Sequence, residues 1–245
     1  TDFPKRTPYG WSNYPYDYYN IWVKNAGPNP YKEEPTLEIL TKKYDLSSDS
    51  IADQIKENPF RILKNNFNFR FALILEFLDS FASSQLFVFL PTLLLLKNFS
   101  IESALGLQSI LFLGYFVGRW LVGSWAKKYY GYKALALAEF GMALVIILLL
   151  ILPSSFIIYI LCFLLGVFAR GTSPVIKSIV FDVLPPTQTK QGAAVHGFIG
   201  DTGSALGQFL FGLLLAWSGI NTPFILAAIA ALVVILLCIT KFNQK

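Results

Sequence analysis

Six long apolar runs dominate this chain and decide what it can fold into. Each is close to the ~20 residues that a helix needs to cross the hydrocarbon core of a bilayer. Backbone groups in lipid must find their hydrogen bonds within their own segment, and the runs are too long for barrel strands, so we expect helices. The predicted helices cover residues 71–96, 104–125, 134–152, 156–180, 192–218 and 223–239. The sequence therefore predicts an all-α membrane protein of six transmembrane helices, with short connections that make successive helices antiparallel.

Composition supports a chain embedded in lipid. Hydrophobic residues make up 54% of the sequence and charged residues only 14%, whereas about a quarter of the residues are charged in a soluble domain. The formal net charge is +5, but the basic residues stand at the ends of apolar runs and not in a stripe with stacking aromatics. We therefore expect the lipid bilayer as a partner and no binding to nucleic acid.

Basic residues are unevenly divided between the two sets of connections. The connections on one side carry Arg61, Lys64, Arg70, Lys127, Lys128, Lys133, Lys190, Lys241 and Lys245. The connections on the other side carry Lys97, which Glu102 offsets, and then the uncharged residues 153–155 and 219–221. Because Lys and Arg are in excess in cytoplasmic loops, we expect both termini on the cytoplasmic face, or on the matrix or stromal face of an organelle.

A polar arm, residues 1–60, precedes the six-helix domain, residues 61–245. Closely spaced Pro, Gly, Tyr and Trp break any regular period in its first thirty residues. We expect an extended arm on the cytoplasmic side, draped on a partner or left as a solvated tail. Short helices are predicted at 36–43 and 48–56, the second ending before Pro59. A start at Thr1 fits removal of Met, cleavage of a targeting peptide, or a start within a longer protein.

Ionisable residues inside the predicted helices each cost about 2.5 kcal/mol or more, so each needs a partner or a function. Glu76 and Asp79 are three residues apart and share a helix face. If that face lines a path through the membrane, the two carboxylates are candidates to carry a proton or to bind a cationic substrate. The alternative is that Glu76 pairs with Arg70. We expect Glu139 to pair with Lys133.

Two cations stand in the fourth predicted helix. Arg170 and Lys177 are seven residues apart and nearly aligned, and Pro174 between them is expected to kink the helix. They are candidates to bind an anionic substrate, a lipid head group or the carboxylate of Asp182. Arg119 lies one turn inside the second helix, where a structural role is favoured, because its side chain can extend to the membrane surface.

His196 is the lone histidine of the chain. Its unperturbed pKa near neutrality makes it a candidate for proton coupling, and a hydrogen bond between helices is the alternative. Asp201 follows five residues later, which places the two side chains on different helix faces and argues against a dyad.

Two stretches resemble the C-terminal six-helix half of a major facilitator superfamily transporter. Residues 123–133 (GSWAKKYYGYK) are similar to the loop between the second and third helices of a half. The positions that carry this similarity are Gly123, Ala126, Lys127, Lys128, Gly131 and Lys133. Lys127 departs from the family's pattern, which usually has at this position an aspartate that stabilises one state of the transporter.

The second stretch, residues 182–193, is similar to the family's loop between the fourth and fifth helices, and the glycine-rich helix that follows matches too. In that helix Gly203 and Gly207 form a small-xxx-small pair that lets another helix approach closely. Pro185 and Pro186 stop the preceding helix. Together the similarity covers about residues 58–242.

The resemblance implies two six-helix halves with a substrate path between them, and this chain holds one half. We therefore expect half of a secondary transporter for a small solute, which needs a second six-helix unit. Candidates for charge along the path are Glu76, Asp79, Arg170, Lys177, His196 and Asp201. The alternative is a non-transporting accessory subunit, packed among other membrane subunits of a larger assembly such as a respiratory or other energy-converting complex.

Enzyme motifs are missing from the sequence. It contains no phosphate-binding Gly-rich loop with Lys-Ser/Thr, no HExxH, no Cys/His metal spacing and no nucleophile elbow. Cys162 and Cys238 lie inside apolar runs, as small buried residues do. We expect no enzymatic activity, no cofactor and no bound metal.

Overall fold

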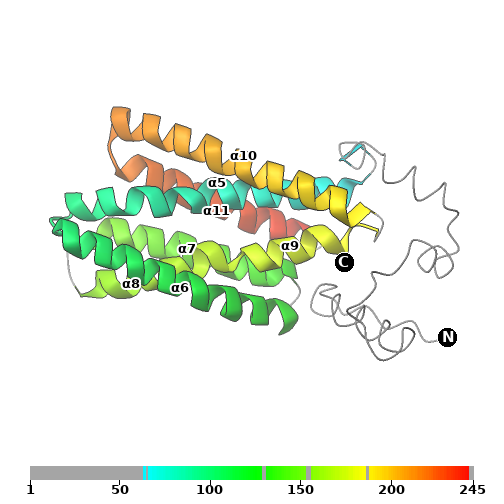
Figure 1. Ribbon diagram of the computed structural model, residues 1–245, viewed down its shortest axis with the longest axis horizontal. Helices are drawn as coiled ribbons and strands as arrows, with labels where there is room; N and C mark the ends of the chain where they lie inside the picture. The colour runs from blue at the N-terminus through cyan, green and yellow to red at the C-terminus, as the bar shows by residue number, and fades with distance from the viewer. Residues whose placement is uncertain (1–62, 65, 129–130, 153–155, 186–187, 243–245) are drawn as a thin grey trace, which may run out of the picture.

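A computed structural model describes residues 63–64, 66–128, 131–152, 156–185 and 188–242. The prediction of an all-α membrane protein is confirmed, because this part of the chain holds six spans that are long and apolar enough to cross a membrane. The helices are α5 (Phe67–Leu96), α6 (Ile101–Lys128), α7 (Gly131–Ile151), α8 (Ile157–Gly171), α9 (Ser173–Asp182), α10 (Thr189–Ser218) and α11 (Asn221–Phe242) (Figure 1). The predicted N-terminal arm and its short helices lie outside the described residues.

Most helices extend beyond their apolar runs, because polar residues at the ends continue or cap the hydrogen-bond ladder. The side chain of Asn66 caps α5 by accepting a hydrogen bond of 3.0 Å from the Phe69 N–H. At the opposite end of the bundle, Lys97 Nζ donates to the Leu152 carbonyl oxygen over 2.6 Å, next to the end of α7. A cation at a helix C-terminus stabilises the exposed carbonyls, which explains a lysine on the side that is poor in basic residues.

The fourth span is broken between α8 and α9, which together run from Ile157 to Asp182. The break falls at Thr172, and Pro174 lies in the first turn of α9. Proline lacks the N–H for the ladder, and its ring clashes with the carbonyl four residues earlier, which belongs to Arg170. The break therefore divides the fourth span into two helices that meet at Thr172.

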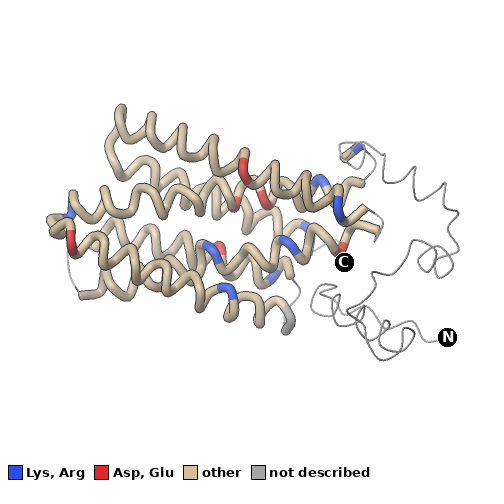
Figure 2. The backbone as a smooth tube through the Cα atoms, in the orientation of Figure 1, with Lys and Arg blue, Asp and Glu red and all other residues tan. Residues whose placement is uncertain are grey.

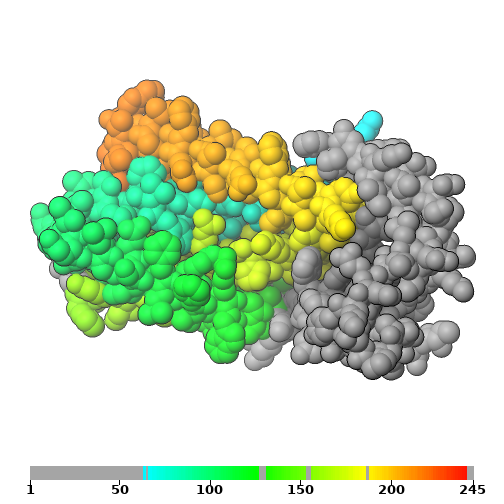
Figure 3. Space-filling model, viewed as in Figure 1, coloured from blue at the N-terminus to red at the C-terminus, as the bar shows by residue number. Residues whose placement is uncertain are grey.

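The bundle is built from pairs of closely packed helices: α6 with α8, α5 with α10, and α7 with α11 (Figure 1). α5 also contacts α11, so α5 lies at the centre of the fold and α7 and α11 lie behind it. In the view of Figure 3, α5 is bordered by α10 on one side and by α6 on the other.

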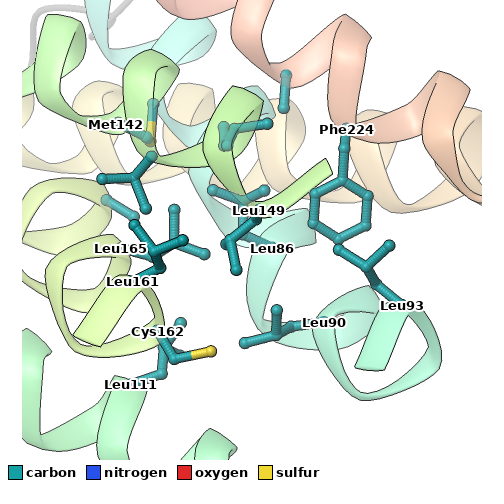
Figure 4. Packing of buried hydrophobic residues seen from close by; sticks show 14 of the residues in the cluster. Leu86, Leu90, Leu93, Leu111, Met142, Leu149, Leu161, Cys162, Leu165 and Phe224 are labelled. Atoms are coloured by element: carbon teal, nitrogen blue, oxygen red, sulfur yellow. The ribbon is translucent and has the colours of Figure 1, made fainter. Parts of the chain in front are cut away.

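The core consists of two apolar clusters with a polar layer between them. The cluster nearer the Lys97 end includes Leu86, Leu149, Leu165 and Phe224, which interdigitate from α5, α7, α8 and α11 (Figure 4). The cluster nearer the other end includes Phe69, Ala134, Val175 and Cys238. Along each of α5, α7 and α10, buried acidic or histidine side chains fall between the two clusters: Glu76, Asp79, Glu139 and His196.

Glycines set the closest helix crossings. A Cβ added at Gly114 or Gly118 of α6 would overlap backbone carbonyl oxygens of α8, those of Phe163 and Val167. A Cβ at Gly203 of α10 would lie 2.6 Å from the Phe77 carbonyl oxygen of α5. In lipid, helix association depends on such close backbone approach, because the tails are as apolar as the side chains.

We predict that Gly118→Ala destabilises the bundle, because the new methyl group must push α6 away from α8. Overpacking of this kind costs about 1–3 kcal/mol. The matched control is Gly106→Ala in the same helix, where nothing lies within 4 Å of the added Cβ. Thermal unfolding of the detergent-solubilised protein, followed by circular dichroism, should show a lower Tm for Gly118→Ala and an unchanged Tm for Gly106→Ala. Equal melting temperatures for the two variants would contradict the close crossing.

Candidate functional site

An open groove of about 450 Å³ lies where α5, α6, α8 and α10 meet. Four elements contribute to its wall, and the wall mixes aromatic rings with polar groups. The lining residues are Ser84, Phe87, Val88, Phe112, Tyr115, Arg170, Ser204 and Gln208. Such a mixture is typical of small-molecule sites, in which apolar side chains give contact area and a few polar groups give orientation.

Arg170 supplies the positive charge of the groove. Its Nη2 donates a hydrogen bond of 3.1 Å to the Ser84 hydroxyl of α5. Its guanidinium carbon lies 5.3 Å from the centre of the Phe87 ring, a cation–π distance. The Ser84 hydroxyl is also 2.7 Å from the Ser204 hydroxyl of α10. Arg170 thus ties together three of the helices that form the groove, and several of its N–H donors remain available for a ligand.

A second guanidinium extends the same surface. Arg119 is exposed, and its guanidinium carbon lies 4.2 Å from the centre of the Tyr115 ring. Tyr115 in turn contacts Phe87 edge to face, with ring centroids 6.3 Å apart. Because residues three, four and seven apart share a helix face, Arg119 stands on the same face of α6 as Phe112 and Tyr115. The sequence favoured a structural role for Arg119 and did not connect it with a groove.

Two of the other candidate charges are exposed and do not line the groove. Lys177 is exposed and follows Arg170 by seven residues, although the break at Thr172 separates their helices. Asp201 is exposed and precedes the lining residue Ser204 by three positions in α10. Of these three candidates, Arg170 lines the groove, Asp201 lies on the helix face of Ser204, and Lys177 is exposed on α9.

Glu76 and His196 lie in the interior instead. Glu76 Oε2 and His196 Nε2 are 3.0 Å apart and join α5 to α10, although the ring N–H is not aligned for a straight hydrogen bond. The Ser80 hydroxyl donates to Glu76 Oε1 over 3.1 Å. The alternative pairing of Glu76 with Arg70 is wrong: six residues separate the two on one helix, which turns them to different sides, and Arg70 is exposed.

Asp79 is the other buried carboxylate of α5, and it lies against the break in the fourth span. The Thr172 hydroxyl donates a hydrogen bond of 2.8 Å to Asp79 Oδ1. Glu139 of α7 is completely buried beside Asp79, with the two carboxyl groups within hydrogen-bonding reach. The expected pair of Glu139 with Lys133 is wrong. Lys133 is exposed in the first turn of α7 and lies six residues before the buried Glu139.

The residues that carried the loop similarity pack against α9. Ala126 is buried, Gly123 faces Pro174, and a Cβ added at Gly131 would lie 3.2 Å from Ile179. Residues 129–130 and the side chains of Lys127 and Lys128 lie outside the described part of the chain. Among the described residues, no three His, Cys, Asp or Glu side chains are placed to hold a metal ion.

Comparison with known protein families shows to which family the chain belongs. The sequence profile of the Major Facilitator Superfamily matches residues 57–244. The chain belongs to the Major Facilitator Superfamily. The resemblance inferred from residues 123–133 and from the glycine-rich helix is thereby confirmed. Comparison with curated proteins gives no significant match.

Solved transporter structures share the fold of this superfamily member. The E. coli fucose:proton symporter FucP matches with a TM-score of 0.65 and 16% identity, over 81% of this chain and 46% of that chain. The POT family transporter PepTSo matches with a TM-score of 0.63 and 17% identity, over 73% of this chain and 38% of that chain. The chain thus spans less than half the length of both transporters, and at these identities the likeness concerns the fold alone.

We predict that His196→Ala destabilises the bundle, because it leaves the buried Glu76 carboxylate without its partner. Losing the partner of a buried charged group costs about 1–3 kcal/mol or more. The double variant Glu76→Gln/His196→Ala should recover part of this loss, and the exposed Lys190→Ala in the same helix is the control. Thermal unfolding compares the wild type, Glu76→Gln, His196→Ala, the double variant and the control Lys190→Ala. Strictly additive losses in the double variant would show that Glu76 and His196 do not interact.

Proposed function

We propose that this chain forms one six-helix half, equivalent to the C-terminal half, of a secondary transporter for a small solute. The second six-helix unit is either another part of the same polypeptide or a separate chain. The solute path lies between the two units, and the groove around Arg170 forms one wall of it. In this arrangement the chain moves solute by rocking against its partner unit and catalyses no chemical reaction.

The observation that carries this proposal is the polar groove on a side of the bundle that is otherwise uncovered. In the most apolar stretch of α5, 61% of the residues are buried, against 28% in α6 and 22% in α10. An arginine and three further polar side chains facing hydrocarbon would be costly, so they call for protein or water as their surroundings. A second six-helix unit placed against α6 and α10 supplies both.

The charges of the groove favour a solute that carries an anionic group. Arg170 and Arg119 both present guanidinium groups beside aromatic rings, and guanidinium binds carboxylate and phosphate through paired hydrogen bonds. The lining residues include no carboxylate. Phe87, Phe112 and Tyr115 add flat apolar surface for the remainder of the solute.

An accessory subunit without transport, the alternative that the sequence left open, is not favoured. In such a subunit the side chains of the groove would be expected to pair with partner subunits and to show no response to free solutes. Binding of small solutes by the isolated protein therefore separates the two functions.

We predict that small organic anions stabilise the protein and that Arg170→Gln abolishes the effect. Because ligands bind the folded state, a saturating anion should raise Tm. The measurement is a thermal-shift screen of dicarboxylates and sugar phosphates against neutral sugars, on the wild type, Arg170→Gln and the exposed control Lys190→Gln. A shift by neutral sugars alone, or one that Arg170→Gln retains, would contradict an anionic solute held by Arg170.

We also propose that the end of the bundle rich in basic residues faces the cytoplasm, or the matrix or stroma of an organelle. Arg70 lies in the first turn of α5, Lys190 in the first turn of α10 and Lys241 at the end of α11, whereas Lys97 and Glu102 lie where α5 ends and α6 begins. Figure 2 shows Lys and Arg in blue toward the end of the bundle that lies near the C-terminus. Excess Lys and Arg mark the cytoplasmic side of multi-pass proteins, so both termini of the chain are placed there.

Cysteine labelling tests this orientation. The two natural cysteines are buried, so a membrane-impermeant maleimide should give little background. We predict that a cysteine at the exposed Asn98 is labelled from the outside of intact cells, and that a cysteine at Lys190 is labelled only after the membrane is opened. The reverse pattern would invert the topology.

A further inference from the structure

Two carboxyl groups meet in the membrane interior without a basic side chain between them. Asp79 of α5 is 4% exposed and Glu139 of α7 is 0% exposed. Their carboxyl groups are within hydrogen-bonding reach of each other. The contact lies in the polar layer between the two apolar clusters, on the side of α5 that faces away from the groove.

The hydrogen bonds around the pair are unequally divided. Asp79 Oδ1 accepts a hydrogen bond from the Thr172 hydroxyl, and the charge of Arg170 also acts on Asp79. Glu139 has no such support: neither of its oxygens has a hydrogen-bond donor among the described residues. An ionised carboxylate cannot donate. Two ionised groups here would repel each other and would leave the Glu139 charge buried without compensation.

One proton removes both difficulties. We propose that Asp79 and Glu139 form a proton-binding site. Glu139 carries the proton, and its hydroxyl donates a hydrogen bond to the Asp79 carboxylate. Glu139 then becomes a neutral donor, and Asp79 accepts from Glu139 and from Thr172. A proton fits better than a metal cation, because the two carboxyl groups already approach each other to hydrogen-bonding reach.

Charged and titratable groups on the surrounding helices leave this assignment intact. On α5, Glu76 adds a further negative charge, which His196 of α10 faces at 3.0 Å. On α8, Arg170 provides the nearby positive charge, and on α11 the buried Cys238 lies near Glu139. Lys177 of α9 and Arg119 of α6 are exposed. Among the described residues, the charge of Arg170 acts on Asp79 and can balance one negative charge of the pair.

The site is connected to the groove through the break in the fourth span. Thr172, which donates to Asp79, is two residues from Arg170, which donates to Ser84 in the groove wall. Loss of the proton would place a second negative charge beside Asp79 and draw the guanidinium away from Ser84. Insofar as the proposed transport function holds, proton occupancy and solute binding at Arg170 would therefore be coupled.

Infrared spectroscopy tests the site without any transport assay. We expect the whole chain in lipid nanodiscs at neutral pH to show a carbonyl stretch from a protonated carboxylic acid that moves to lower frequency in D₂O. Glu139→Gln should remove this band and still fold, because the amide N–H can donate to Asp79 as the acid does. Asp79→Asn should remove or shift the band. Asp201→Asn, which changes an exposed carboxylate at similar depth, should leave it unchanged.

The proposal is overturned if the wild type lacks the band, or if the band persists in Glu139→Gln. Should Glu139→Gln not fold, the wild-type D₂O shift and Asp79→Asn still decide the question. Stabilisation by NaCl over choline chloride that depends on Glu139 would assign the site to a metal cation and would also overturn it. The infrared experiment does not depend on the thermal-shift screen for anions. The proton site and the transport function can therefore be refuted independently of each other.

Discussion

Close backbone contact between glycine-bearing helices is the constraint on which this structure depends. Lipid tails offer no apolar driving force for helix association, so the bundle is held by packing at short range and by a few polar contacts. Gly114 and Gly118 let α6 lie directly on α8, and Gly203 and Gly207 let α10 lie directly on α5. These two crossings fix α6 and α10 as flanking helices, with α5 and α8 recessed between them, and the groove is a consequence of that arrangement.

The charged residues of the membrane interior divide into two groups with different surroundings. Arg170 lines the open groove, and the exposed Arg119 lies over the ring of the lining residue Tyr115. Asp79 and Glu139 face the back of the bundle, where apolar clusters above and below exclude water. Thr172 lies between the groups, at the break between α8 and α9 within the fourth span. The break thus connects the groove at Arg170 with the buried Asp79 carboxyl group, which belong to the proposed solute site and the proposed proton site.

The length of the apolar runs was sufficient to predict the six helices, and the motifs around Gly123 and Gly203 were sufficient to predict the family. The charge pairings were not predictable, because they join helices far apart in the sequence: Glu76 meets His196, and Glu139 meets Asp79, instead of the local partners Arg70 and Lys133. The crossing of α6 and α8 had a visible signal, since Gly114 and Gly118 form a small-xxx-small pair. The groove had no such signal in the sequence. Its lining residues Ser84, Arg170 and Gln208 are on three different helices, and only the fold brings them together.

The proposed transport function requires a second six-helix unit against the groove. Electron cryomicroscopy of the protein, extracted gently from its native membrane, can show whether that unit is present. We expect six further helices packed against α6 and α10, with Arg170 lining a water-filled path between the two units. A structure in which lipid or unrelated subunits cover α6 and α10, with no path at Arg170, would contradict it.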